Sequence, residues 1–391
     1  MAAQVCKIAC REAPVGRSRQ TLQRAAAPTP RQPNYNKNVK SWDTIVIGGG
    51  IIGLSLAIEL HKRGLRVLVV EKGEPGREAS WAAGGMLVDS PEETTVALRE
   101  LAWASARMYP EFVRELEDES GLKIDLRSVG TVVFTDVEAG LCPAGTGKSP
   151  ATTLEPALSE GVVQHFQALF LDERCVDPRD LMAAAIAAAR HRGIDFSSGD
   201  TVLAVEVAEG RACGVRTNKT RFAAGTVVNC AGAWAGQIEP HGFPTRPVKG
   251  QMLCVVMPEK EMVRHVVRSP DVYLIPRSDG RMLIGATQEE AGFDKRVIPE
   301  TIQKMRQAAL ALVPKLADAR ILEAWAGLRP GTPDGLPILG ATATPGYFVA
   351  SGHFRDGILL APVTAKVMGQ FVTGQRPEID LSKFSAARLG W

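Results

Sequence analysis

The 391-residue chain is poor in aromatic residues, and its excess of positive charge is confined to one end. Phe, Trp and Tyr make up only 6% of the chain, and residues 1–40 hold eight Lys or Arg against one acid. The formal net charge of +3 therefore leaves −4 for the remaining residues. Nucleic-acid binding needs a basic face, often with interleaved aromatic side chains. We therefore expect no nucleic-acid partner.

Long apolar runs and paired cysteines are also missing. No stretch reaches the ~20 apolar residues of a membrane-spanning helix, and the N-terminus lacks the apolar segment of a secretory signal. The seven cysteines are scattered, without a Cys-x-x-Cys pair and without His at metal-ligand spacing. These absences predict a cytoplasmic protein without a transmembrane segment or a metal site, whose cysteines are buried spare thiols.

Residues 1–40 are rich in Arg, Ala, Pro and Gln. Such a composition cannot bury enough apolar surface to order itself, so it predicts a disordered basic tail. A transit peptide and an extended start of the chain would look similar, and the composition does not separate these alternatives. We exclude the tail from the fold.

The remaining pattern predicts an α/β fold that opens with a strand, a glycine turn and a helix. Thr44 to Ile47 is a β-branched run, the turn follows at 48–50, and an apolar helical pattern from Ile51 ends at Gly64. A second buried strand is expected at 66–70. This arrangement is typical of the first unit of a parallel nucleotide-binding sheet.

Further segments divide between two expected sheets. Helices are expected at 92–118 and 180–192, and strands at 201–207 and 226–229 should join the first sheet. Strand patterns at 127–134, 247–257, 272–276 and 282–286 fit an antiparallel second sheet, and residues 142–153 read as a surface loop. With the chain length, this predicts a Rossmann-like nucleotide domain formed by residues 42–120, 176–245 and 325–380. A mostly antiparallel β substrate domain takes residues 121–175 and 246–324.

Gly48, Gly50 and Gly53 match the Gly-x-Gly-x-x-Gly pattern with a strand before it and a helix after it. The first glycine makes the turn, the second lets the backbone approach a pyrophosphate, and the third lets helix and strand pack closely. Glu71 ends the second strand, where a carboxylate binds ribose hydroxyls and disfavours NADP. These residues predict a dinucleotide and leave FAD and NAD open.

Residues 76–87 (GREASWAAGGML) closely resemble the flavin loop of glycine oxidases in the D-amino-acid oxidase superfamily. Similar motifs follow at 247–251, 273–277, 325–332 and 352–362. The resemblance implies that the nucleotide is FAD, with the flavin ring between the two domains. No cysteine follows Cys254, so we expect non-covalent FAD. By position, FAD-binding roles fall on Gly48, Gly50, Ile51, Ile52, Gly53, Glu71, Lys72, Ala79, Ser80, Gly84, Gly85, Met86, Val202, His353, Phe354, Arg355, Asp356, Gly357, Ile358 and Leu359.

Substrate-contacting roles follow from the same resemblance. Arg329 corresponds to the arginine that pairs with the substrate carboxylate, Arg355 and Met86 to further substrate-contacting positions, and Tyr273 to an active-site tyrosine. A planar guanidinium fork fixes a carboxylate in two places, and the cofactor supplies the redox chemistry. We therefore expect no essential acid or base among the side chains. Lys249 fits either a solvated strand end or a cation near the ring.

Two positions depart from the family pattern. Asp271 stands where a His is expected, so substrate selectivity follows less directly than the cofactor. Asp356 stands where the family typically has Asn, and it places an acid near the flavin. We expect a helix to begin near Asp356 and Gly357, with the carboxylate as a cap and Pro362 inside the first turns.

These observations predict an enzyme that oxidatively deaminates glycine or another small amino acid or amine. Oxygen would be the acceptor, and the products from glycine would be glyoxylate, ammonia and hydrogen peroxide. The resemblance also implies a place in thiamine biosynthesis, and a homo-oligomer is compatible with it. The alternatives are a D-amino-acid dehydrogenase that reduces a quinone, an NAD dehydrogenase, and a protein that binds FAD only structurally.

Overall fold

The computed structural model describes residues 41–91, 93–136, 151–161 and 166–390. The basic tail at 1–40 and the part of the expected loop at 142–150 lie outside the described residues. Residues 151–153, the rest of that expected loop, lie instead in helix α4 (Ala151–Leu154). In the described ranges, no helix is long and apolar enough to cross a membrane.

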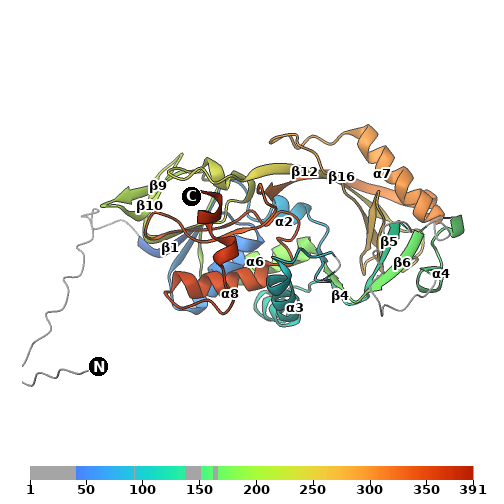
Figure 1. The fold of residues 1–391 in the computed structure, drawn as a ribbon, viewed down its shortest axis with the longest axis horizontal. Coiled ribbons are helices and arrows are strands. Elements are labelled where there is room, and N and C mark those ends of the chain that lie inside the picture. Colours follow the sequence, from blue (N-terminus) through green and yellow to red (C-terminus); the bar gives the residue numbers. More distant parts are fainter. Residues whose placement is uncertain (1–40, 92, 137–150, 162–165, 391) are drawn as a thin grey trace, which may run out of the picture. The chain divides into compact units, whose positions relative to one another are not determined.

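An eight-stranded sheet forms one layer of the described part of the chain (Figure 1). Its path runs β17-β18-β11-β1-β2-β8, and the hairpin of β9 and β10 extends from β11. The pairs of β1 with β2 and β11, of β2 with β8 and of β11 with β18 are parallel. Its strands are β1 (Ser41–Ile47), β2 (Val67–Glu71), β8 (Asp195–Ser198), β9 (Val202–Ala208), β10 (Arg211–Thr217), β11 (Arg221–Asn229), β17 (Ile338–Ala341) and β18 (Tyr347–Ser351).

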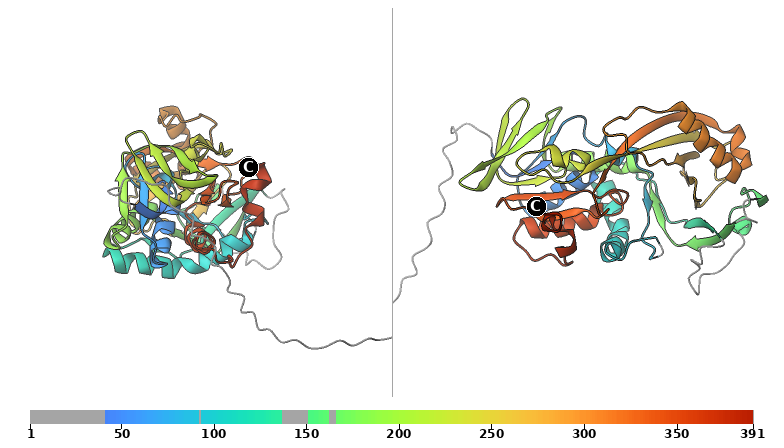
Figure 2. Two further views of the ribbon diagram at one scale, coloured as in Figure 1. Left: turned by 90° about the vertical axis from the view of Figure 1, so that its left-hand side faces the viewer. Right: turned by 45° about the horizontal axis from the view of Figure 1, so that its top comes forward.

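Alternate residues of the first two strands pack into different cores. Val46 of β1 and Val69 of β2 face a layer of helices, whereas Ile45 and Leu68 face the core beneath the β9–β10 hairpin. This alternation follows from the two-residue repeat of a strand, and apolar residues on both sides are typical of a parallel sheet. The covering helices are α1 (Ile51–Lys62), α3 (Arg99–Ser120), α6 (Pro178–His191) and α8 (Ala361–Val372). Figures 1 and 2 show the red α8 beside the teal α3.

A second sheet of seven strands, within the described ranges, follows the order β16-β12-β15-β14-β13-β5-β6. All neighbours are antiparallel except β13 and β5, which confirms the expected mostly antiparallel sheet. Helix α7 (Pro299–Leu312) packs on it through Met305, Ala309 and Leu312. The strands are β5 (Thr131–Asp136), β6 (Phe166–Leu171), β12 (Arg246–Val256), β13 (Val266–Arg268), β14 (Tyr273–Pro276), β15 (Arg281–Gly285) and β16 (Arg320–Gly331).

Short elements complete the fold. A three-stranded sheet orders as β3-β7-β4 in the described residues. These elements are β3 (Met86–Leu87), β4 (Leu126–Arg127), β7 (Arg174–Val176), α2 (Ala79–Ala82), and the 3₁₀ helices η2 (Gly232–Gln237), η3 (Pro314–Asp318), η4 (Ser382–Phe384) and η5 (Ala386–Leu389). The fold class expected from the sequence is confirmed. The exact domain boundaries stay a prediction, and the one expected at 325 falls inside β16.

Two further expected elements differ from the structure. The helix expected at 92–118 begins only at Arg99 and continues to Ser120, because the run Thr94-Thr95-Val96 consists of weak helix formers. The strand expected at 127–134 is divided between β4 and β5, which belong to different sheets. Gly130 lies between them with φ +83°, and its backbone passes so close to the Phe170 ring that a Cβ would overlap it.

Candidate active site

A cavity of about 930 Å³ collects residues from both large sheets. Its volume is near the upper end of the roughly 300–1,000 Å³ of small-molecule pockets, so it has room for a large ligand. Gly53 and Leu359 are not among the lining residues, but the other predicted site residues are. These are Gly48, Gly50, Ile51, Ile52, Glu71, Lys72, Ala79, Ser80, Gly84, Gly85, Met86, Val202, Tyr273, Arg329, His353, Phe354, Arg355, Asp356, Gly357 and Ile358.

The glycine turn, residues 48–53, connects β1 to α1 at one end of the cavity. Gly48 has φ +107°, and a Cβ there would lie 2.5 Å from the Cys230 carbonyl oxygen. A Cβ at Gly53 would overlap the Gly48 carbonyl oxygen, so Gly53 serves the packing of helix on strand and not the cavity wall. The Ile51 amide, at the start of α1, donates to Ser80 Oγ at 3.0 Å. The remaining first-turn amides of α1 have no acceptor within the helix and suit an anion.

Glu71 ends β2 beside this turn, as the sequence predicts. Its Oε2 accepts the Gly49 amide at 2.8 Å, and its Oε1 accepts the Gly73 amide at 2.9 Å. The carboxylate therefore fixes the turn as well as lining the cavity, and each oxygen retains capacity for a further donor. The next residue, Lys72, has its Nζ 3.1 Å from the centroid of the Trp234 ring.

The segment 79–86 is held by one side chain from β16 and by one that directly follows β14. The Trp325 indole donates to the Ala82 carbonyl at 3.1 Å, and Arg277 Nη2 donates to the Gly84 carbonyl at 2.6 Å. Arg277 is only 1% exposed. Gly85 has φ +79°, and a Cβ there would overlap the Val176 carbonyl oxygen. Contacts far along the chain thus shape this loop.

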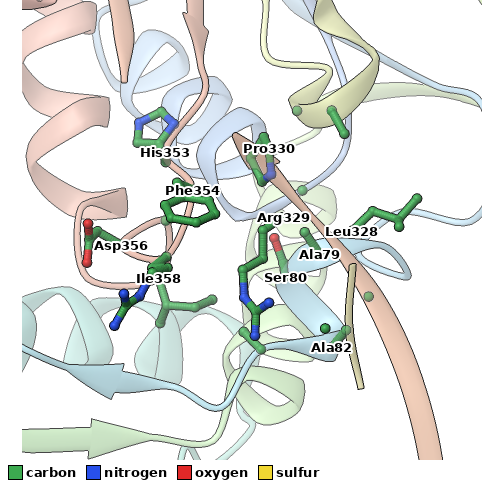
Figure 3. Close-up of a pocket in the computed structure, with 18 of the residues that line it drawn as sticks. Ala79, Ser80, Ala82, Leu328, Arg329, Pro330, His353, Phe354, Asp356 and Ile358 are labelled. Atoms are coloured by element: carbon green, nitrogen blue, oxygen red, sulfur yellow. The ribbon is translucent and has the colours of Figure 1, made fainter. Parts of the chain in front are cut away.

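Arg329, on β16, reaches into the cavity from the second sheet. Its Nη1 donates to the Thr287 carbonyl at 3.0 Å. The guanidinium lies against the backbone of Gly250, where a Cβ would be 2.6 Å from Cζ. Figure 3 shows Arg329 between α2 and the turn that carries Phe354 and Ile358.

Tyr273 lies at the same end of the cavity as Arg329, and its side chain is a neutral phenol. Burial raises the pKa of its hydroxyl, while the nearby charge of Arg329 opposes that shift. The hydroxyl donates to Met252 Sδ at 3.2 Å. Sulfur is a weak acceptor, so this hydroxyl can turn to a better partner in the cavity.

Residues 353–360 form a turn before α8, and its first residues combine a strained backbone with shifted pKa values. Phe354 has φ +46°, and its amide donates to the Pro330 carbonyl at 3.0 Å. Burial lowers the pKa of His353 to about 3, so the imidazole is neutral, and its Nε2 lies 3.1 Å from Thr364 Oγ1. Burial raises the pKa of Asp356 to about 6, against the opposing charge of Arg355.

The helix expected to begin near Asp356 and Gly357 begins at Ala361 instead. No side chain of the described residues caps it, so the expected capping role of Asp356 is wrong. Pro362, in the first turn, cannot donate a hydrogen bond to the carbonyl four residues earlier, so regular helix does not extend back through the 353–360 turn.

A family model described as FAD dependent oxidoreductase matches residues 43–371. The chain belongs to this family. FAD is therefore its cofactor, and the 353–360 turn is called the flavin turn below. Cys230 lines the cavity, and burial raises the pKa of its thiol far above its ordinary value. An unreactive thiol supports non-covalent FAD.

Individual relatives agree with this assignment. The chain is 37% identical over 364 residues to the bifunctional protein ThiO/ThiG of Trichormus variabilis, covering 89% of this chain and 55% of that protein. It thus spans about half the length of that relative. It is 34% identical to a glycine oxidase of Pseudomonas aeruginosa, covering 88% of this chain and 98% of the relative. The crystal structure of a glycine oxidase from Geobacillus kaustophilus has a TM-score of 0.84 at 32% identity, covering 89% and 99% of the two chains.

Several residues that line the FAD-dependent oxidoreductase cavity received no role from the sequence. Three of them are strand glycines at which a Cβ would collide with a neighbouring side chain. The collisions would be of Gly250 with Arg329, of Gly285 with Tyr273 and of Gly327 with Ala82. An isolated glycine in a strand pattern often marks such a close approach, so the sequence pattern could have identified these three positions. Arg268 and the segment 93–95 also line the cavity, and no local pattern marks them.

Lys249 and Asp271, two positions left open by the sequence, have clear surroundings. Lys249 is 1% exposed, and its Nζ lies 3.6 Å from Glu289 Oε2, so it is not a solvated strand end. Lys249 is also absent from the cavity lining, whereas its neighbour Gly250 is present. Asp271 is exposed and lines the cavity. Among the described cysteines, Cys175, Cys230 and Cys254 are buried free thiols and Cys213 is half-buried.

Proposed function

We propose that this chain oxidatively deaminates glycine or another small amino acid or amine. Glycine, water and oxygen would give glyoxylate, ammonia and hydrogen peroxide. The observation that carries the proposal is the position of Arg329, a guanidinium inside the FAD cavity beside the phenol of Tyr273. The likeness to proteins named glycine oxidase, over nearly their full length, supports the same activity.

Arg329 would hold the substrate carboxylate. Its Nη1 donates to the Thr287 carbonyl, and the guanidinium also makes a side-chain hydrogen bond with Tyr273. A guanidinium has five N–H donors, so others are left for a carboxylate. The bond to Thr287 and the contact with Gly250 limit how the guanidinium can rotate. A fixed guanidinium orients the α-carbon of a small amino acid, and orientation accounts for much of the rate gain in such reactions.

The surrounding residues fit a reaction without a catalytic base. The flavin ring of bound FAD is the hydride acceptor and supplies the redox chemistry. His353 is neutral, buried and hydrogen-bonded to Thr364, so it serves to position the backbone. Tyr273 stays protonated at neutral pH and can donate to the carboxylate. The amine needs only to arrive uncharged or to lose its proton to water.

The test is anaerobic mixing of the FAD-loaded protein with glycine, sarcosine or D-alanine, followed by air and a peroxide assay. We expect the flavin absorbance to bleach with substrate and to return rapidly in oxygen. Slow return in air with fast return on adding a quinone would indicate a D-amino-acid dehydrogenase. An absorbance that no amine bleaches would refute the enzyme assignment.

Arg329→Ala tests the carboxylate assignment. Loss of charge-assisted hydrogen bonds should lower kcat/KM for glycine on the order of 100-fold, with FAD content unchanged. Arg246→Ala is the matched control, because Arg246 lies on the neighbouring β12, pairs with Glu290 at 3.1 Å and does not line the cavity. Equal kinetics in the two variants would contradict the role of Arg329.

Three finer parts of the hypothesis accompany this activity. We propose that oxygen is the acceptor and that the protein acts in the cytoplasm. We also propose that its product enters thiamine biosynthesis, which the match to a ThiO/ThiG protein supports.

A further inference from the structure

Pro362 leaves a backbone carbonyl of the flavin turn without its helical partner. It lies in the first turn of α8 and has no N–H, so it cannot donate to the Ile358 carbonyl four residues earlier. The hydroxyl of Tyr109, in α3, donates to that carbonyl at 2.7 Å. The Ala361 amide makes only a longer contact of 3.3 Å. Tyr109 is completely buried and lies 249 residues away along the chain.

Ser105, one turn earlier on the same face of α3, contacts the next carbonyl. Its Oγ donates to the Leu359 carbonyl at 2.6 Å and accepts the Val363 amide at 3.3 Å. In a continuous helix, that amide would donate directly to that carbonyl. The serine hydroxyl is therefore inserted between them, and Ser105 is completely buried.

Pro110 provides an internal comparison. It lies inside α3, and its missing donor is replaced at the Ala106 carbonyl by Arg174 Nη1 at 3.3 Å. There the helix continues without interruption. At Pro362, by contrast, α8 does not continue: it begins at Ala361, where the two α3 hydroxyls bind the preceding carbonyls, and the flavin turn lies outside the helix. Tyr109 and Ser105 therefore stabilise a non-helical backbone as well as satisfying buried carbonyls.

Among the described residues, several backbone amides of this turn have no hydrogen-bond acceptor. The amides of Gly357, Ile358 and Leu359 have no acceptor among the described residues, and Gly357 and Ile358 line the cavity. No described residue of α3 lines it, so α3 holds the turn from outside. A peptide unit is planar and trans, so fixing the Ile358 carbonyl towards α3 directs the Leu359 amide the other way.

We propose that Tyr109 and Ser105 are positioning residues that hold the flavin turn in its non-helical conformation, which leaves the Gly357 and Ile358 amides free at the cavity wall for FAD. Preorganised backbone donors stabilise negative charge where it develops, and the reduced flavin carries such charge at its pyrimidine end. The two hydroxyls act through the backbone and do not touch the cofactor. The inference needs FAD binding but not glycine oxidation, so it stands or falls separately from the substrate assignment.

Tyr109→Phe tests the proposal because it removes the hydroxyl alone. We expect the dissociation constant of FAD to rise about tenfold, as for a buried carbonyl left unpaired. The affinity of the FAD-loaded protein for sulfite, an anion that adds to the flavin ring, reports stabilisation of charge on that ring. We expect the sulfite dissociation constant to rise about tenfold as well.

Tyr347→Phe is the matched control. Tyr347 is also completely buried, its hydroxyl accepts Asn229 Nδ2 at 3.0 Å, and it packs in the other core. We expect a similar loss of thermal stability in the FAD-free protein and no change in sulfite affinity. Ser105→Ala should also raise the sulfite dissociation constant. This variant tests the proposal if Tyr109→Phe does not fold. An unchanged sulfite dissociation constant in both α3 variants, or an equal rise in Tyr347→Phe, would overturn the proposal.

Discussion

The glycine turn and the surroundings of Arg329 line one cavity, but the chain builds them differently. The turn comes from one stretch, β1 to α1, with Glu71 following within about 20 residues. The position of Arg329, on β16, depends on contacts with Gly250 of β12 and with Thr287 in the segment after β15. The first is local in sequence, and the second exists only when β12 and β16 are paired.

This difference separates cofactor binding at the glycine turn from the proposed substrate binding at Arg329. A local motif has its geometry fixed by backbone conformation, so a change there should affect FAD. A site assembled from several strands depends on side chains that meet in the folded protein. Changes there should affect substrate kinetics and leave FAD in place. Four predictions follow, from the largest expected effect to the smallest, and the first two test this separation directly.

Gly48→Ala should abolish FAD binding. The new Cβ would lie 2.5 Å from the Cys230 carbonyl oxygen, on a backbone with φ +107°. Gly64→Ala is the control, because Gly64 has φ +84° but no atom within 4 Å of its Cβ position. It should lose only about 1 kcal/mol to backbone strain and keep its FAD. The measurement is flavin absorbance per protein, and a fully loaded Gly48→Ala protein would contradict the assignment.

Gly250→Ala should raise the KM for glycine about tenfold with FAD retained, because the added methyl would displace the Arg329 guanidinium. Gly225→Ala is a matched strand control, since Gly225 in β11 has no atom within 4 Å of its Cβ position. Steady-state kinetics of both variants make the comparison. Equal KM values would mean that Gly250 does not set the position of Arg329.

Tyr273→Phe should lower kcat/KM for glycine about fivefold, the effect of losing one neutral hydrogen bond of ~1 kcal/mol. Because the pKa of the Tyr273 hydroxyl is raised, the group is protonated throughout the neutral range. The shape of the pH–rate profile should therefore stay the same in the variant. Loss of a titration step between wild type and variant would show that Tyr273 ionises during turnover.

Asp356→Asn should change the pH dependence of the stability of the FAD-free protein. The folded pKa of about 6 lies above the ordinary 3.8, so the folded state binds the proton more tightly than the unfolded state. The wild type therefore loses stability as pH rises from about 4 to about 6, and the cost is complete above that range. The stability difference between Asp356→Asn and the wild type should therefore favour the variant more at pH 8 than at pH 4.

Asp279→Asn is the control of opposite sign. Burial alone would raise the pKa of Asp279, but hydrogen bonds from Arg281 lower it below its usual range. Its ionised form therefore stabilises the fold above the ordinary pKa, and this contribution is lost in acid. The variant should be less stable than wild type at neutral pH, with the difference shrinking as pH falls. Thermal melts across pH distinguish the two signs.

Much of the fold was predictable because the signals were local. The first strand, turn and helix, the helix at 178–191 and the strands β12, β14 and β15 fall within a few residues of their expected positions. The errors occur where tertiary contacts compete with local preference. Gly130 passes the Phe170 ring and divides one expected strand, and the α3 hydroxyls accompany the late start of α8.

The sequence by itself determined a dinucleotide site, because the glycine turn and Glu71 lie within one contiguous strand-helix-strand unit. Its motifs, through their resemblance to a known family, also indicated FAD and Arg329. Only the tertiary structure decided that Lys249 pairs with Glu289, that the Arg329 guanidinium lies against Gly250, and that the Tyr109 hydroxyl donates to the Ile358 carbonyl. These contacts join residues that lie tens to hundreds of positions apart, so no local pattern encodes them.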